Sequence, residues 1–366
     1  MAKIPKYRMI YEYYRDLIES GALKPEERLP TEGEIKRQFS VSQITTINAL
    51  KQLAADGYVT RVQGSGTYVR AKAPIASGAM QLVLLVIPFM GKGRESRLIE
   101  SVERCLGQAG YTLIIKNSCD SDAVERQIVE QYKDRVSGIL LYPSIQLGNI
   151  ELYRALADAD YPIVYLDRYP LSVPCRYVSS DNAQGGALLA RYLLRRKYER
   201  FVLAFHSVPG LTSERDRLNG FMNVLVDAGV GDEHTSCFFF DNAELAESVV
   251  RVSDEAQRLV ASGARTAIFT CNDSTAYRVM DRLRQCGVTG ADDRLIVAGF
   301  DNLNIAPVTM PFVTISQQHA DIGRHAAQIL IRRLERPHFY NEYRQVPVEL
   351  YEPPIVRAPA PDDPAS

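Results

Sequence analysis

Residues 29–69, LPTEGEIKRQFSVSQITTINALKQLAADGYVTRVQGSGTYV, contain the pattern that decides the fold of the N-terminal part of the chain. Thr31 and Glu34 have the Thr-x-x-Glu spacing of a capping box, which predicts that a helix begins here. Ser42 is a candidate N-cap for the next helix, and Gly57 is expected to end that helix. Two helices joined by so short a turn predict a helix-turn-helix.

The segments on either side complete a small domain. Upstream, apolar side chains recur at helical spacing within residues 7–20, YRMIYEYYRDLIES. Downstream, residues 58–70 alternate around Gly64-Ser65-Gly66, which predicts a hairpin, or wing. A three-helix adaptor domain without a nucleic-acid role is the alternative interpretation. The third helix is expected to bury Ile47, Leu50 and Leu53.

Charge is unevenly distributed along the 366 residues. Residues 1–72 carry 12 Lys and Arg against 8 Asp and Glu, whereas the rest of the chain carries 31 against 36. A basic segment joined to an acidic one is typical of a nucleic-acid-binding module fused to another domain. No apolar run is long enough to span a membrane, and the charged N-terminus does not resemble a signal peptide. We therefore expect a cytoplasmic protein.

Residues 5–70 resemble the winged-helix DNA-binding domain of GntR-type transcription regulators. Leu-Pro-Thr-Glu, Val-Ser and the Gly-x-Gly-Thr-Tyr-Val of the hairpin carry the resemblance. It implies that the third helix lies in the major groove, with its N-terminal side chains on the base edges. Gln43, Thr45 and Asn48 are the implied base contacts, with Ser42 on a phosphate.

The sequence departs from the family pattern on this helix. Gln43 and Ile47 stand where arginines are common in the family, so the operator sequence of relatives does not transfer to this chain. Ile47 either touches a thymine methyl group or belongs to the core. The glycines of the wing allow a close approach to the DNA backbone. The remaining candidate DNA contacts are Arg8, Arg28, Lys36, Arg37, Arg61, Gly64 and Gly66.

Residues 71–80 are rich in Ala, Pro, Gly and Ser and predict a linker. After it, apolar runs alternate with amphipathic segments, which predicts an α/β body with parallel sheets. The strands are too numerous for one small sheet, so we expect two doubly wound lobes. The expected divisions are 1–70 for the winged helix, 81–352 for the body and 353–366 for a flexible tail. The expected strands are 81–88, 111–116, 137–143, 161–167, 200–205, 236–240, 266–270 and 295–300.

Polar side chains follow several of these strands. Asp167 with Arg168, Asn272 with Asp273, and Asp301 each stand where a strand ends. Ligands of doubly wound folds bind beyond the carboxyl ends of the strands, where these groups converge. Carboxylates, amides and an arginine suit a polyhydroxylated ligand. Purely structural roles are the competing interpretation: caps for Asp181 and Asp273, a turn for Asp301, and a surface position for either Arg215 or Arg217.

Five segments of the body resemble the effector domain of the lactose/galactose repressor family. They are VSSDNAQGGALLARYLL (178–194), RDRLNGF (215–221), AIFTCNDSTAYRVM (267–280), IVAGFDN (296–302) and FVTISQQHADIGRHAAQIL (312–330). The resemblance implies a fold like that of periplasmic sugar-binding proteins, with two lobes and three crossovers. It implies an effector pocket lined by Phe89, Asp167, Arg217, Asn272, Asp301 and Gln317, with the loop 89–96 contributing.

Together the two modules are similar to those of arabinose-responsive repressors. They imply a homodimer that reads a pseudo-palindromic operator and is released by a pentose or deoxyhexose bound between the lobes. A regulator of the same kind that answers a purine or a sugar phosphate is the alternative, with Arg168 and Arg215 as phosphate ligands. An exported sugar-binding protein is disfavoured, because the basic head would have no role there.

The sequence contains no P-loop, no Gly-x-Ser-x-Gly and no His-Glu-x-x-His motif, so we expect no enzyme. The five histidines show no metal-binding spacing, and the six cysteines contain no Cys-x-x-Cys pair. We therefore expect no cofactor, no metal site and no disulfide.

Overall fold

The computed structural model describes residues 6–55, 58–62, 65–69, 81–90, 94–208, 210–241, 243–288, 293–303, 310–335 and 342–354. The chain divides into two compact units, Met1–Gly78 and Ala79–Ser366, which we call the head and the body. Several predicted features lie outside the described residues: the helix end at Gly57, the wing glycine Gly64, the linker 71–80, and all but the first two residues of the tail.

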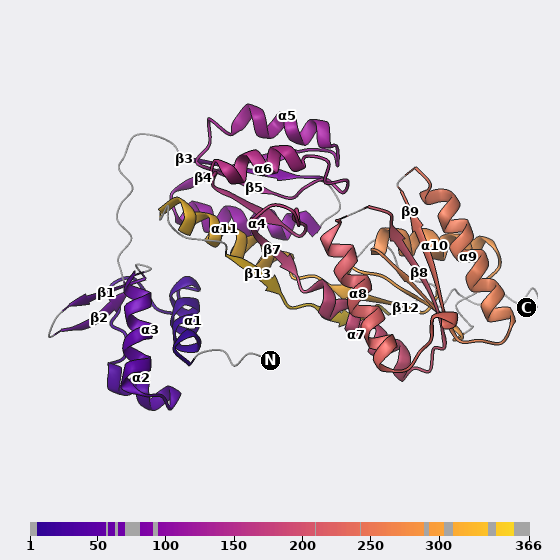
Figure 1. Ribbon diagram of the computed structural model, residues 1–366, viewed down its shortest axis with the longest axis horizontal. Helices are drawn as coiled ribbons and strands as arrows, with labels where there is room; N and C mark the ends of the chain where they lie inside the picture. The colour runs from indigo at the N-terminus through magenta and orange to yellow at the C-terminus, as the bar shows by residue number, and fades with distance from the viewer. Residues whose placement is uncertain are drawn as a thin grey trace, which may run out of the picture. The chain divides into compact units, whose positions relative to one another are not determined.

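The head consists of three helices and an antiparallel hairpin (Figure 1). At the second helix the predicted capping box is present, because Thr31 accepts the N–H of Glu34 and the Glu34 carboxylate accepts the N–H of Thr31. Ser42 caps the third helix by accepting the N–H of Thr45 at 3.2 Å. The elements are α1 (Lys6–Glu19), α2 (Glu32–Phe39), α3 (Gln43–Ala55), β1 (Val59–Val62) and β2 (Gly66–Val69).

The buried face of α3 differs from the predicted one at a single position. Leu50 and Leu53 are buried as expected, but Ile47 is only half-buried. Thr46 is buried instead, so the inward positions are 46, 49, 50 and 53. This is the i, i+3, i+4, i+7 spacing of a single helix face, and Ile47 lies at its margin.

The first lobe of the body is a six-stranded parallel sheet covered on both faces (Figure 1). Helices α4 and α11 pack on one face, and α5 and α6 on the other. Alternate residues of β3 point to opposite faces, with Val83 and Leu85 towards α4 and Leu84 and Val86 towards α5. The strands, in sheet order, are β13 (Tyr343–Val346), β7 (Arg176–Ser180), β6 (Ile163–Leu166), β5 (Gly138–Leu141), β3 (Gln81–Ile87) and β4 (Tyr111–Asn117). The helices are α4 (Arg94–Gln108), α5 (Asp122–Tyr132), α6 (Ile150–Asp158) and α11 (His319–Glu335).

The second lobe repeats this plan around one hydrophobic core. Its sheet is parallel except for β14, which runs antiparallel to β12 at the edge. The strands, in sheet order, are β14 (Glu349–Tyr351), β12 (Phe312–Ser316), β11 (Leu295–Ala298), β10 (Thr266–Thr270), β8 (Arg200–His206) and β9 (Thr235–Phe240). The helices are α7 (Asn182–Arg195), α8 (Thr212–Asp227), α9 (Leu245–Ala261), α10 (Asp273–Gln285) and the short η1 (Asp232–His234).

The chain passes between the lobes three times: after β7, after β12, and between β13 and β14. The expected two-lobed α/β body with three crossovers is therefore confirmed. The eight predicted body strands all exist, but β7, β12, β13 and β14 were not among them. Strands β7, β13 and β14 are short and carry polar or exposed side chains, so no apolar run marks them. None of the helices described is long and apolar enough to cross a membrane.

Candidate functional site

Helix α3 presents its first turns to solvent. Gln43 and Asn48 are exposed, and Thr45 is half-buried. The hydroxyl groups of Ser42 and Thr45 are hydrogen-bonded, with their oxygens 2.8 Å apart. Ile44, which the sequence analysis did not single out, is 70% exposed and lies one helical turn before Asn48. Its place on the same face of α3 as Asn48 makes it a further candidate for contact with DNA, and the spacing of four residues was the available signal.

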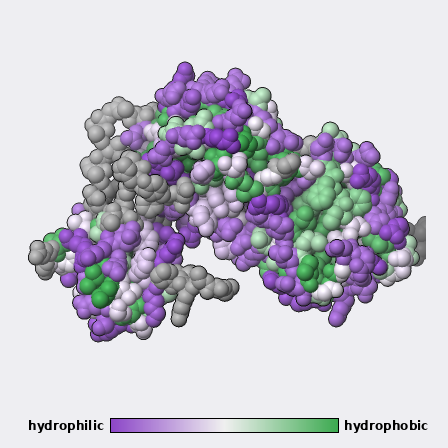
Figure 2. All heavy atoms as spheres, in the orientation of Figure 1, coloured by the Kyte–Doolittle hydropathy of each residue, from purple (hydrophilic) through white to green (hydrophobic). Residues whose placement is uncertain are grey.

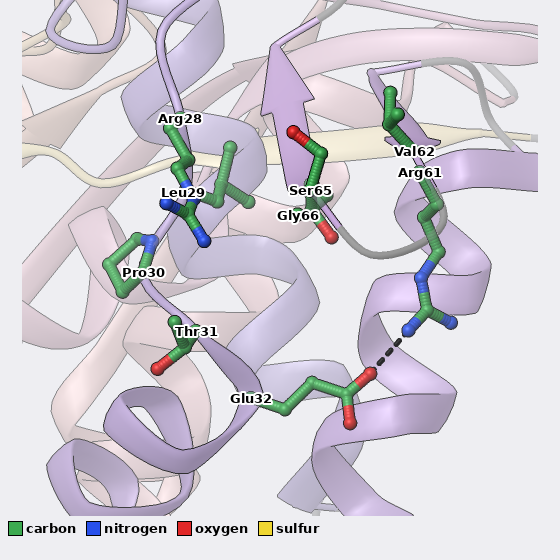
Figure 3. A pocket seen from close by; sticks show the side chains of 10 residues that line it. Arg28, Leu29, Pro30, Thr31, Glu32, Arg61, Val62, Ser65 and Gly66 are labelled. Carbon is green, nitrogen blue, oxygen red and sulfur yellow. Dashed lines mark hydrogen bonds and ion pairs between the residues drawn. The ribbon is translucent and has the colours of Figure 1, made fainter.

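A hollow of about 630 Å³ separates the wing from the start of α2 (Figure 3). On one side, the Arg61 guanidinium forms an ion pair with Glu32 in the first turn of α2. On the other, Arg28 lies against Gly66, where a Cβ would sit 2.7 Å from Arg28 Nε. The missing side chain of Gly66 therefore accommodates an arginine of the head itself, and the approach of a DNA backbone to this glycine stays a prediction.

The other basic candidates lie on the surface of the head. Arg8 pairs with Glu12 at 3.1 Å, Arg37 donates to the carbonyl of Gly33 at 3.3 Å, and Lys36 is exposed. Exposed ion pairs of this kind are weak and can exchange for a phosphate at little cost. The DNA contacts proposed for these residues remain predictions.

In the body, a close crossing of two helices positions the central arginine. Helices α7 and α8 touch at Gly186 and Gly220, where an added methyl group would overlap the main chain of the opposite helix. Gly185 lies against the ring of Phe300, 2.6 Å from the place of a Cβ. This contact brings the start of α7 against the first two turns of α8 and places Arg217 at the carboxyl ends of the second-lobe strands.

Arg217 is held on three sides. Its Nε donates to Asn182 Oδ1 at 2.9 Å, and its Nη1 donates to the carbonyl of Cys271 at 2.6 Å. The guanidinium carbon lies 3.9 Å from the centre of the Phe300 ring. Arg215, two residues earlier, is exposed and pairs with its neighbour Asp216. The expectation that one of the two arginines lies at the surface is therefore confirmed.

Asp301 and Gln317 form a second buried connection at the same end of the sheet. Gln317 Nε2 donates to Asp301, and Gln317 Oε1 accepts from the hydroxyl of Ser180 at 2.6 Å. Ser180 ends β7 of the first lobe, so this chain of hydrogen bonds runs from one sheet to the other. Asp301 has a φ of 125°, a strained backbone conformation for a residue with a side chain.

The expected division of roles between Asn272 and Asp273 is reversed. Asn272 is the N-cap of α10 and accepts the N–H of Thr275 at 2.9 Å. Asp273 is fully buried and accepts from the N–H of Leu303 and the hydroxyl of Thr314, each at 2.7 Å. Burial, together with the charge of Asp301, raises the pKa of Asp273 to about 7. The sequence analysis expected Asp273 to be the cap. Either residue can cap a helix, and sequence spacing does not show which of two neighbours turns inward.

Asp181 occupies the equivalent place at α7. Its carboxylate accepts the N–H of Gln184 at 2.9 Å, so it serves as the N-cap, which was one of its two expected roles.

The first lobe contributes a buried arginine at the end of β6. Arg168 lies 5.0 Å from the centre of the Tyr142 ring and 4.0 Å from Asp167, and both charged residues are buried. Its Nε and Nη1 atoms are buried without a hydrogen-bond partner among the described residues. Burial alone would lower the pKa of Arg168, but Tyr142, Asp167 and Asp120 together raise it, so the side chain stays charged.

Phe89, the remaining predicted pocket residue, packs its ring edge-on against Tyr142, with ring centres 5.4 Å apart. Residues 91–93 of the loop 89–96 lie outside the described part of the chain. The predicted pocket residues thus fall into two groups: Phe89 and Asp167 in the first lobe, and Arg217, Asn272, Asp301 and Gln317 around the second. Arg168 joins the first group, and its place next to Asp167 in the sequence was the available signal.

Two protein families match parts of the chain. Residues 6–69 match the gntR family of bacterial regulatory proteins, and residues 190–356 match the periplasmic binding protein-like domain. The chain joins a GntR-type DNA-binding head to a periplasmic-binding-protein-like body. Both resemblances drawn from the sequence are thereby confirmed.

Curated proteins are similar to this chain over different shares of its length. An arabinose metabolism transcriptional repressor of Geobacillus stearothermophilus is 28% identical over 338 residues, or 91% of this chain and 92% of that protein. The repressor PurR of Photobacterium profundum is 28% identical over 243 residues, or 66% of this chain and 70% of that protein.

Solved structures support the fold of the body. A LacI family transcriptional regulator from Enterococcus faecium, with bound ribose, has a TM-score of 0.60 at 20% identity. The similarity covers 77% of this chain and 100% of that chain. This similarity concerns the fold alone.

Proposed function

We propose that this chain is a transcriptional repressor of carbohydrate-utilisation genes whose affinity for its operator is controlled by a neutral monosaccharide. The observation that carries the proposal is the pairing, in one chain, of a winged-helix head with a body whose charged and amide side chains gather at the carboxyl ends of two parallel sheets. The similarity to arabinose metabolism repressors supports the carbohydrate part. Such a repressor acts where its operator is, in the cytoplasm.

The charge balance of the site favours a neutral ligand. Two carboxylates, Asp167 and Asp301, and two guanidinium groups, Arg168 and Arg217, are buried at these strand ends. A further buried carboxylate, Glu214, is hydrogen-bonded to His206. A ligand with a formal charge would leave this set unbalanced in a poorly solvated place. Sugar hydroxyl groups both donate and accept, so they can bond to carboxylates and to the unpartnered nitrogens of Arg168 alike.

The two lobes are connected by side chains that a ligand can rearrange. Gln317 joins Ser180 of the first lobe to Asp301 of the second. A sugar that binds one lobe arrangement more tightly shifts the population towards it, and only this difference in affinity drives the change. A coupling of about 1–3 kcal/mol, typical of such proteins, would change operator affinity roughly 5- to 150-fold. We propose that the sugar weakens operator binding.

Two copies are needed to read the two halves of a pseudo-palindromic operator. The edge strand β9 is a candidate dimer contact. Figure 2 shows hydrophobic side chains gathered on the second lobe, where Figure 1 draws β9. Phe239 on β9 is 49% exposed, and Val226 on α8 is 66% exposed. Sedimentation of the wild type and of Phe239→Glu tests this contact. We expect the wild type to be a dimer and the variant a monomer. If the variant is also a dimer, the interface lies elsewhere.

A purine or a phosphorylated sugar is the second candidate effector. The buried positive charge of Arg168 favours it, because the Nε and Nη1 atoms lack a hydrogen-bond partner among the described residues and an anionic ligand could bind to either. The balanced charges described above argue against it.

Thermal unfolding of the full chain separates the two candidates. The panel contains pentoses, deoxyhexoses, hexoses, sugar phosphates and purine bases. A ligand at 100 times its dissociation constant stabilises the folded state by about 2.7 kcal/mol. A free sugar that stabilises the wild type and Asp293→Asn, an exposed control, but not Asp301→Asn, supports the proposal. A response to phosphates or purines alone would contradict it.

Operator binding is tested separately on the head. Gln43→Ala should weaken binding to a selected operator far more than binding to random DNA, because base contacts carry the sequence information. Lys24→Ala, an exposed lysine at no predicted contact, is the matched control. Equal losses on both kinds of DNA would remove Gln43 from the set of base-reading residues.

A further inference from the structure

Three side chains with metal-binding atoms meet behind the wall of the effector site. His206 ends β8, Glu214 lies in the first turn of α8, and Cys271 follows β10. One ligand atom of each lies within 4.8 Å of the other two. His206 Nδ1 lies 2.8 Å from Glu214 Oε1. Sequence spacing could not reveal the cluster, because His206 and Cys271 are 65 positions apart and the three residues belong to different parts of the lobe.

The cluster is enclosed and its side chains are fixed in place. The side chains of His206 and Glu214 are 5% and 9% exposed, and Cys271 is fully buried. Glu214 Oε2 also accepts the main-chain N–H of His206 at 3.0 Å, and the Cys271 N–H donates to the carbonyl of Ala204 at 2.8 Å. The ring of Phe240 covers the imidazole at 4.7 Å. A rigid, largely dry arrangement of ligands lowers the entropy lost when an ion binds.

We propose that His206, Glu214 and Cys271 form a site for a divalent transition metal of the zinc class. Thiolate, imidazole and carboxylate are the three protein ligands of Zn²⁺, and a site with three of them leaves the fourth tetrahedral position for water. Around such an ion the ligand atoms stand about 3.5 Å apart. The His206–Glu214 pair, at 2.8 Å, therefore has to open slightly, and the most distant pair has to close by roughly 1 Å. The ion displaces the proton shared by His206 and Glu214 and the proton of the Cys271 thiol, which enter the solvent.

Cys271 connects the proposed metal site to Arg217 of the effector site. The main-chain carbonyl of Cys271 accepts from Arg217 Nη1 at 2.6 Å, while its thiol faces the metal ligands. Glu214 and Arg217 also interact electrostatically. Metal binding would therefore change the effector affinity. This coupling rests on the proposed function, whereas metal binding itself does not.

The test is titration of the full chain with Co²⁺, which reports a cysteine ligand through a thiolate-to-cobalt charge-transfer band in the near ultraviolet. We expect this band in the wild type, its loss on addition of Zn²⁺, and its absence in Cys271→Ser. Cys286→Ser and Cys237→Ser, which remove exposed thiols, should retain it. A wild type without the band at millimolar Co²⁺, or a band that survives in Cys271→Ser, would overturn the proposal.

His206→Gln and Glu214→Gln provide a second readout that does not depend on the thiol. Loss of a group that only orients a ligand lowers metal affinity about 10- to 100-fold, so loss of a ligand should lower Zn²⁺ affinity at least 100-fold. An unchanged affinity in both variants would refute the assigned ligands. The coupling is read from sugar affinity with and without Zn²⁺. Zinc binding without any change in sugar affinity refutes the coupling alone, and the absence of any sugar response contradicts the proposed function instead.

Discussion

The head and the body place their candidate functional side chains in opposite environments. On α3 of the head, Gln43, Ile44 and Asn48 stand in solvent. In the body, Arg217 and Asp301 are buried and bonded to other protein groups. Exposed side chains on a DNA-binding surface make few contacts within the protein, so substitutions there should leave folding intact. A buried polar site is part of the fold, so substitutions there should affect stability and ligand response together.

The close crossing of α7 and α8 gives the largest expected effect. In Gly186→Ala the new methyl group meets the main-chain oxygen of Arg217, which neither helix can move without repacking. We expect the free energy of unfolding to fall by about 3 kcal/mol or more. Gly107→Ala on α4 is the matched control, because its methyl group meets only ordinary contacts and replaces a poor helix former. Denaturant unfolding measures the free energy of unfolding of both variants. An equal loss in the two would contradict this account.

Arg217 gives the next largest effect, and Arg215 on the same helix is its control. Arg217→Leu leaves Asn182 Oδ1 and the carbonyl of Cys271 without their donor, which costs about 2–3 kcal/mol. The same variant should lose its response to the effector while it retains operator affinity, because the head is a separate compact unit. Arg215→Leu removes only an exposed ion pair and should behave as the wild type in calorimetry and in DNA binding. A normal effector response in Arg217→Leu would remove this arginine from the site.

Asp273 makes the stability of the body depend on pH. Its pKa rises from 3.8 in the unfolded chain to about 7 in the folded one, so between these values only the folded state holds the proton. Stability from this group is therefore present at low pH and is lost as the pH rises towards 7. Each pH unit corresponds to about 1.4 kcal/mol, so the wild type should lose about 2 kcal/mol relative to Asp273→Asn between pH 5 and pH 7.

Comparison with the variant cancels the other titrating groups, and Asp293→Asn, an exposed carboxylate, should follow the wild type. Parallel curves for the wild type and Asp273→Asn would mean that Asp273 is ionised throughout this range.

Local signals in the sequence were sufficient for the head. The capping box at Thr31 and the N-cap at Ser42 act within three residues, so their spacing alone fixed where two helices begin. In the body the apolar runs located most of the buried strands, and Asp301 stood at the end of one of them. The resemblance to the lactose/galactose repressor family brought Arg217 and Gln317 to the same region. Apolar runs could not reveal β7, because its final serines face a polar neighbourhood, with Ser180 bonded to Gln317 137 residues later.

What the sequence could not supply was the direction of individual side chains. Asn272 and Asp273 are neighbours, and only the packing of Thr314 and Leu303 decides that the aspartate turns inward. Likewise Ile47 and Ile44 are three positions apart on α3. The sequence analysis considered Ile47 for contact with DNA, whereas the structure shows that Ile44 is the more exposed of the two. The packing of α3 against α1 and α2 buries Thr46 and leaves Ile44 outside.

Ile44 gives the smallest predicted effect and tests the exposed half of the comparison most directly. Ile44→Ala should change the free energy of unfolding by less than about 0.5 kcal/mol, because the side chain packs against little. If Ile44 contacts a thymine methyl group, the variant should weaken operator binding by about 1 kcal/mol, and replacing that thymine by uracil should weaken wild-type binding equally. The two changes should not add, because each removes the same contact. Fluorescence anisotropy on thymine and uracil operators measures all four combinations. Additive losses of operator affinity would show that Ile44 acts elsewhere on the DNA. A large loss in the free energy of unfolding would show that Ile44 supports the fold of the head, as Arg217 supports that of the body.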